Sequence, residues 1–184
     1  MDEITGKHFE NLRSGDRDLR YQSFLALLAA TEEPVDWAYE VWDELVANLG
    51  HKDNHVRAIA AQLLANLAKS DPYERMLKDF DALLAVTRNP RFVTARHCLQ
   101  SIWKVGAAGI SQREILIDGL SGRFFECASE KNCTLVRFDI VQGLKHLFDA
   151  TGDAQVRETA QALIGMETDE KYRRKYAGLW RGSL

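Results

Sequence analysis

The sequence contains few side chains of the types that bind metals or catalyse reactions, and those few are sparsely placed. His51 and His55 are four residues apart, a spacing that on one helix would turn both imidazoles to one face and suit a metal ion. Asp53 between them is a typical N-cap, which predicts that His51 lies in a turn and His55 in the first turn of the next helix. Because no third ligand is near, we expect no metal and no cofactor.

The cysteines form a second candidate group. Cys127 and Cys133 flank the turn SEKN, but one such pair without a second pair or a nearby histidine is weak evidence for zinc. With Cys98 they make three, which is too few for a disulfide framework and is typical of a reducing compartment. We therefore expect ordinary buried thiols in a cytoplasmic protein.

No catalytic constellation is present in the sequence. It lacks G-x-S-x-G, a Walker-type glycine-rich loop and H-E-x-x-H, and its serines have no accompanying histidine pattern. The arginines at positions 57, 137 and 157 recur at equivalent places, which is more typical of hydrogen bonds that tie one structural unit to the next than of an anion site. We do not predict an enzyme.

The elements that carry these residues are helices. After Asp53, apolar residues recur at intervals of three and four, which places them on one face of an α-helix. These residues are Val56, Ile59, Ala60, Leu63, Leu64 and Leu67. Ser70-Asp71-Pro72 ends this helix, because the residue before a proline resists the helical conformation. The pattern returns after Asn132 and after Asp153, and the unit has a period of about 36 to 43 residues.

These units resemble the HEAT repeat family, whose second helix typically opens with an Asp and a Val-Arg pair ahead of Ala and Leu positions. Asp53 with Val56-Arg57 and Asp153 with Val156-Arg157 match this pattern, and Val136-Arg137 matches with Asn132 in the acidic place. The copy near Asn89 has Val93-Thr94 instead. The resemblance covers most of the chain and implies an all-α, armadillo-like fold, a right-handed α-solenoid of about four to five helix pairs.

A single domain over residues 1–184 is expected, with short loops and a capping helix and tail at 168–184. Outer helices are predicted near residues 3–14, 35–49, 72–88 and 111–128. Inner helices are predicted near residues 16–31, 53–69, 90–106 and 132–149, followed by an inner-type helix near 153–166 and a terminal helix near 168–180.

Charge and hydropathy restrict the partners. The net charge of −3 and the pI near 6.0 argue against a protein that binds nucleic acid regardless of sequence. The start MDEITGKHFENL is neither a signal peptide nor an anchor, and no run approaches the roughly 20 apolar residues of a membrane-spanning helix. The stretch from Glu32 to Glu44 is acidic and predicts a negatively charged outer helix.

Inner-helix positions that point away from the core predict a partner-binding stripe on a concave face. Its residues are Arg96, His97, Gln100, Trp103, Lys104, Phe138, Val141, Gln142, Lys145 and His146. This mixture of basic, amide and apolar groups suits a peptide-binding groove, in which apolar anchors supply affinity and polar groups set the register of the peptide. A solvated face without a partner is an equal alternative. If the stripe is exposed, charge reversal at Arg96 and Lys104 should weaken binding and leave stability nearly intact.

The tail interleaves Tyr172, Tyr176 and Trp180 with basic residues, a mixture that can bind nucleic acid. Aromatic residues at helical spacing are more typical of a helix that covers the last repeat.

Two functions remain. The favoured one is a small HEAT-repeat scaffold, adaptor or regulatory subunit that binds a protein or peptide segment through its concave face. The alternative is a nucleic-acid-binding protein of the alkylpurine DNA glycosylase type, with roles for Trp103, Arg137 and Asp139; a continuous positive cleft around an exposed Trp103 would favour it.

Overall fold

The computed structural model describes residues 1–182, and every regular element in that range is a helix, which confirms the all-α prediction. The α-helices are α1 (Glu3–Asn11), α2 (Arg17–Ala30), α3 (Ala38–Asn48), α4 (Asn54–Leu67), α5 (Arg75–Val86), α6 (Phe92–Ser101), α7 (Trp103–Ala108), α8 (Ile110–Glu126), α9 (Cys133–Thr151), α10 (Ala154–Met166) and α11 (Glu170–Gly178). Two short 3-10 helices, η1 (Ala68–Ser70) and η2 (Cys127–Ser129), extend α4 and α8. None of the helices among the described residues is both long and apolar enough to cross a bilayer.

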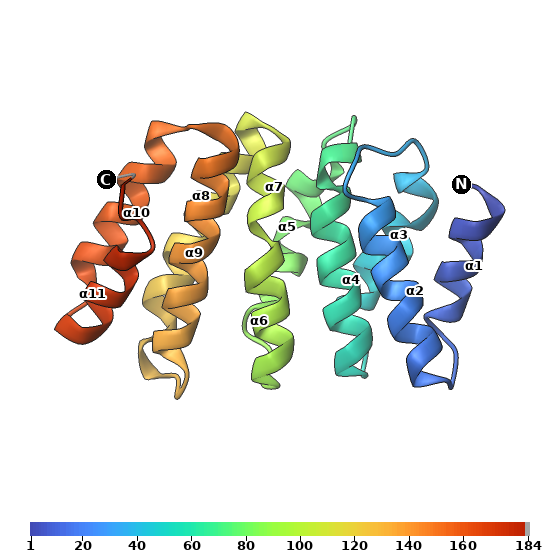
Figure 1. The fold of residues 1–184 in the computed structure, drawn as a ribbon, viewed down its shortest axis with the longest axis horizontal. Coiled ribbons are helices and arrows are strands. Elements are labelled where there is room, and N and C mark those ends of the chain that lie inside the picture. Colours follow the sequence, from blue (N-terminus) through green and yellow to red (C-terminus); the bar gives the residue numbers. More distant parts are fainter. Residues whose placement is uncertain (183–184) are drawn as a thin grey trace.

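The helices stand in two rows along an elongated molecule. Helices α2, α4, α6 with α7, and α9 lie side by side in the front row of Figure 1, while α3, α5 and α8 lie behind them. We call the front row the inner face. Each helix packs mainly on its neighbours in sequence and on the equivalent helix of the next pair, as α4 does on α3 and α6.

Aspartate caps set where several helices begin. The Asp53 carboxylate accepts a hydrogen bond from the backbone N–H of His55, and Asp16, Asp153 and Asp169 cap α2, α10 and α11 in the same way. Asn132 precedes α9 without a side-chain cap bond.

The inner helices carry the core. Leu63, Leu64 and Leu67 of α4 are all fully buried, as the apolar spacing of that helix predicts. The inner helix expected at 90–106 is divided at Ile102 into α6 and α7. Near this point the Ser101 hydroxyl donates to the carbonyl oxygens of His97 and Cys98, and serines so bonded often bend helices.

The last pair differs from expectation. Helix α10 packs on α8 as well as on α9, and α11 packs on α9 and α10. Helix α10 is therefore the outer helix of a fifth pair, and the prediction of an inner-type helix at 153–166 is wrong. The periodicity of α10 resembles that of an inner helix because both kinds bury one apolar face.

The C-terminal aromatic residues are internal. The side chains of Tyr176 and Trp180 are fully buried. The Tyr176 hydroxyl donates to the Thr134 carbonyl over 2.8 Å, and the Trp180 indole donates to the Val141 carbonyl over 3.3 Å. These two rings cannot stack on nucleic-acid bases. Of the predicted tail at 168–184, residues 183–184 lie outside the described range.

The expectation of three free thiols is wrong for two of them. Cys127 and Cys133 form a disulfide across the turn between α8 and α9, whereas Cys98 is free and buried. Burial raises the pKa of the Cys98 thiol far above its ordinary range, so Cys98 is not a reactive thiolate.

Two of the recurring arginines link neighbouring pairs, as predicted. Arg57 donates to the carbonyl of His51 and to the side chains of Asn54 and Asn89, the last in the turn before α6. Arg137 of α9 donates to Glu167 over 2.9 Å, beyond α10.

Candidate functional site

A groove with a volume of about 1220 Å³ crosses the inner face. It is formed by the N-terminal halves of α2, α4 and α6, which lie side by side in Figure 1. Helix α2 contributes Arg17, Asp18, Arg20, Tyr21 and Phe24, helix α4 contributes Asn54, His55, Ala58, Ile59 and Gln62, and α6 with its preceding turn contributes Pro90, Arg91, Phe92, Val93, Thr94 and His97.

The groove is positively charged although the chain as a whole is acidic. Arg17, Arg20 and Arg91 line it, and none of the three forms an ion pair among residues 1–182. In this part of the chain the Arg20 guanidinium donates only to the Ser14 carbonyl, over 2.6 Å. Asp18 is the one acidic side chain among the lining residues. The groove therefore has two excess positive charges and open hydrogen-bond donors, which suit an anionic partner.

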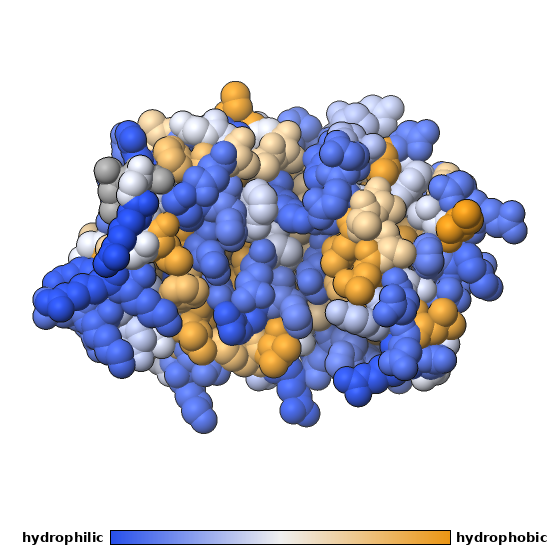
Figure 2. Space-filling view, viewed as in Figure 1, coloured by the Kyte–Doolittle hydropathy of each residue, from blue (hydrophilic) through white to orange (hydrophobic). Residues whose placement is uncertain are grey.

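Apolar surface lies between these charges. Tyr21 and Val93 are exposed, at 57% and 67% of their surface, and Phe24 and Phe92 are half-buried. Figure 2 shows the apolar surface of this side of the molecule as separate patches among polar side chains. A groove of this kind offers several small apolar contacts and no single continuous apolar face.

Two histidines add a titratable component. His55 of α4 and His97 of α6 both line the groove. Desolvation by the surrounding side chains lowers the pKa of His97, and the nearby charges of Arg96 and His55 lower it further. His97 is therefore neutral at pH 7 and gains a positive charge in more acidic solution.

The stripe predicted from sequence lies farther along the inner face, on α6, α7 and α9, and only its His97 reaches the groove. Its main cation is already paired: Arg96 donates two hydrogen bonds to Asp139, Nε to Oδ2 over 2.7 Å and Nη2 to Oδ1 over 2.9 Å. The Asp139 side chain is fully buried. Gln100 approaches the same carboxylate at 3.5 Å, so these groups form a link between α6 and α9.

The rest of the α7 part of the stripe is also engaged within the chain. Lys104 donates to the Asn66 side chain over 2.6 Å and forms an ion pair with Glu32 at 3.3 Å. The half-buried Trp103 ring packs on the ring of His146, with the two centroids 5.5 Å apart.

On α9 one predicted contact residue is wrong. Val141 is fully buried and its carbonyl accepts from the Trp180 indole, so its side chain cannot touch a partner. Phe138 lies against Tyr176 and under the ammonium of Lys175, and Lys145 pairs with Asp149 over 2.6 Å. Gln142 is half-buried.

The groove residues of α2 were missed although the sequence contains a signal for them. Arg17, Arg20, Tyr21 and Phe24 are spaced i, i+3, i+4 and i+7, which places all four on one helical face. The third arginine of the groove, Arg91, is distant from them in sequence. It lies in the same groove only because α4 packs between α2 and α6.

The acidic outer helix is partly neutralised. Glu40 pairs with the N-terminal ammonium group, Asp43 with Arg75, and Glu44 with Arg13. These are surface pairs, which contribute little to stability but reduce the negative field of α3.

Comparison of the sequence with protein-family models matched no family, and comparison with curated proteins found no relative.

Proposed function

We propose that the protein is a small non-catalytic adaptor, a right-handed α-solenoid of HEAT-like helix pairs, that binds an acidic peptide segment along its inner face. The binding site is the groove across α2, α4 and α6. The observation that supports this most strongly is a set of three arginines that have no acidic partner within residues 1–182, gathered in one groove of an otherwise acidic chain.

The composition of the groove suits a peptide better than a bare anion. Arg17, Arg20 and Arg91 provide charge complementarity, which speeds association and sets register, while Tyr21 and Phe24 provide apolar contacts. The N-termini of α2 and α4 are already capped by Asp16 and Asp53. At α2 and α4 the ligand is therefore held by side chains and not by the helix ends.

The glycosylase-like alternative has one supporting observation, the mixture of arginine and aromatic side chains in the groove, which also suits a single-stranded nucleic acid. The residues proposed for that role are engaged elsewhere. Trp103 packs on His146, Arg137 donates to Glu167, and Asp139 is held by Arg96. The arginines without ion pairs among residues 1–182 lie on α2 and at the N-cap of α6, and not around Trp103.

The test measures fluorescence anisotropy of a fluorescein-labelled peptide EDLEDL with an amidated C-terminus. The double variant Arg17→Glu/Arg91→Glu should bind it at least tenfold more weakly than the wild type, since two attractive charges become repulsive. The matched control Arg173→Glu/Arg181→Glu changes the net charge equally at exposed residues in and just after α11 and should stay within twofold.

Equal losses in the two double variants would refute the groove as the site. A labelled oligo-dT strand of 12 nucleotides is the competing probe. Binding of this strand but not of the peptide, with loss in the groove variant, would instead favour the nucleic-acid function.

A further inference from the structure

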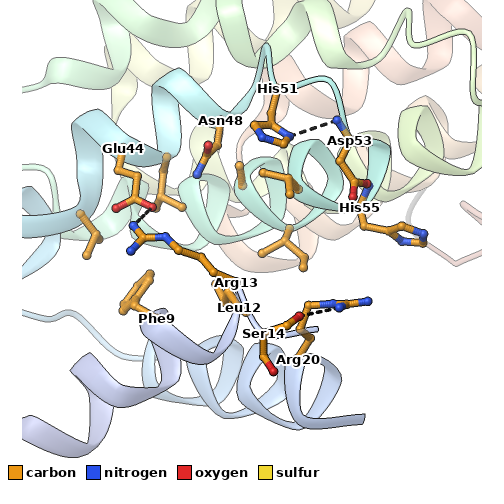
Figure 3. Close-up of a pocket in the computed structure, with 15 residues that line it drawn as sticks. Phe9, Leu12, Arg13, Ser14, Arg20, Glu44, Asn48, His51, Asp53 and His55 are labelled. Carbon is orange, nitrogen blue, oxygen red and sulfur yellow. Dashed lines mark hydrogen bonds and ion pairs between the residues drawn. The ribbon is translucent and has the colours of Figure 1, made fainter. Parts of the chain in front are cut away.

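A second cavity adjoins the groove at its α2 side. It has a volume of about 390 Å³ and lies between the α1–α2 pair and the α3–α4 pair, as Figure 3 shows. This volume is within the range of about 300–1,000 Å³ typical of ligand pockets. Phe9, Leu12, Val56 and Ile59 line its apolar part and remain only half-buried, because the cavity separates them.

Hydrogen-bond donors line the same cavity. Arg20 is a cation without an acidic partner among the described residues. The His51 Nδ1 accepts a hydrogen bond from the Asp53 N–H over 3.0 Å, which places the ring proton on Nε2 and makes that atom a donor. Asn48 has a half-buried side chain that forms no hydrogen bond within residues 1–182, so its amide is also open to a ligand.

Each of the two carboxylates of the lining accepts one hydrogen bond within the described chain. Glu44 accepts from Arg13 over 2.5 Å, and an Asp53 oxygen accepts from the His55 N–H over 2.8 Å. One oxygen of each carboxylate is thus engaged, while Asn48, His51 and Arg20 keep hydrogen-bond donors available to a ligand. An apolar floor beside open donors suits a carboxylate attached to an apolar group.

The cavity is adjacent to the groove. Arg20, His55 and Ile59 line both of them. A segment that occupies the groove therefore has its end close to the cavity.

From this geometry we propose that the cavity binds the C-terminal residue of the partner segment. The apolar side chain of that residue lies on Leu12, Val56 and Ile59, its free carboxylate accepts hydrogen bonds from Asn48 and His51, and Arg20 on the α2 side adds an attractive charge. This proposal rests on the proposed function and adds to it a requirement for a free chain end that bears an apolar side chain.

The first experiment tests the cavity without the groove. N-acetyl-leucine and N-acetyl-leucinamide are each titrated into the ¹⁵N-labelled protein and followed by ¹H–¹⁵N correlation spectra. The carboxylate should shift the amide signals of Asn48, His51 and Ile59, and its Kd should be at least fivefold lower than that of the amide, because charge-assisted hydrogen bonds are the stronger ones. Equal shifts from both compounds, or none at these residues, would overturn the proposal.

The second experiment compares the peptide EDLEDL as free acid and as amide. The free acid should bind the wild type at least tenfold more tightly than the amide. Val56→Phe fills the cavity and Asn48→Ala removes one donor, so both variants should lose most of this preference, whereas the control Arg173→Glu/Arg181→Glu should keep it. Thermal melts followed by circular dichroism confirm that the variants are folded.

The outcomes separate the two proposals. If amide and acid bind equally well, and Arg17→Glu/Arg91→Glu weakens both, the groove stands and the cavity proposal is refuted. If neither peptide binds but N-acetyl-leucine shifts the amide signals of the cavity residues, the acidic-peptide function is refuted. The cavity then binds a small carboxylate, and its role as a site for a chain end is refuted as well.

Discussion

The ion pair between Arg96 and Asp139 should be a principal link between α6 and α9. Arg96→Met keeps much of the aliphatic stem and removes both hydrogen bonds, of 2.7 and 2.9 Å, from a carboxylate that is fully buried. Only Gln100, at 3.5 Å, remains near it. Leaving one partner of a buried pair without the other costs about 3–5 kcal/mol, since the remaining charge is uncompensated.

The expected loss lies at the lower end of that range. The Arg96 side chain is itself 35% exposed, so water can enter the space that it leaves and solvate part of the carboxylate. We therefore expect the unfolding free energy to fall by about 3 kcal/mol. This corrects the expectation from sequence that charge changes at Arg96 leave stability nearly intact, because that expectation treated Arg96 as an unpaired surface residue.

The assay is urea denaturation followed by circular dichroism at constant pH, with comparison of midpoints at equal slope. Arg91→Met is the matched control, because Arg91 is exposed and unpaired within residues 1–182, and it should change stability by less than about 0.5 kcal/mol. The double variant Arg96→Met/Asp139→Leu should regain most of the loss, since the buried charge is gone. A loss below about 0.5 kcal/mol for Arg96→Met alone would refute the reasoning.

Three further predictions follow from burial and charge. Leu64→Ala should lower the unfolding free energy by about 2–5 kcal/mol in the same assay, because Leu64 is fully buried; a loss below about 1 kcal/mol would contradict this. The hydrogen bond from Arg113 lowers the pKa of Asp153. The wild type should therefore be more stable than Asp153→Asn by a constant free energy above about pH 5, and this difference should shrink as the pH falls below about 4. A stability difference that increased in acid would contradict this prediction. Peptide binding in the groove should tighten as the pH falls below about 6.5, since His97, whose pKa is lowered, gains charge there, and His97→Gln should reduce this dependence in anisotropy titrations at fixed ionic strength.

Local patterns predicted most of the helices. The apolar spacing after Asp53 predicts both the extent of α4 and the burial of Leu63, Leu64 and Leu67, because a helix that buries one face needs that period whatever it packs on. The aspartate caps at positions 53 and 153 predicted where α4 and α10 begin, since a cap acts on the first turn of its own helix.

The candidate site was predicted less well. The stripe on α6, α7 and α9 was chosen as the set of inner-helix residues that point away from the core. Whether such a residue is free depends on what lies opposite it: Arg96 meets Asp139, which is 43 residues away, and Val141 is covered by Trp180. His97 is the one residue of the stripe that lines the groove.

The sequence by itself determined which stretches are helical, where several of them begin and which face of each is buried, because these properties depend on contacts within about four residues. Only the tertiary structure decided that Cys127 and Cys133 are joined, that α10 lies in the outer row, and that Arg17, Arg20 and Arg91 share one groove. Those outcomes depend on how neighbouring helices are aligned. Shifting or turning one helix against the next changes which distant side chains meet, and no local spacing records that alignment.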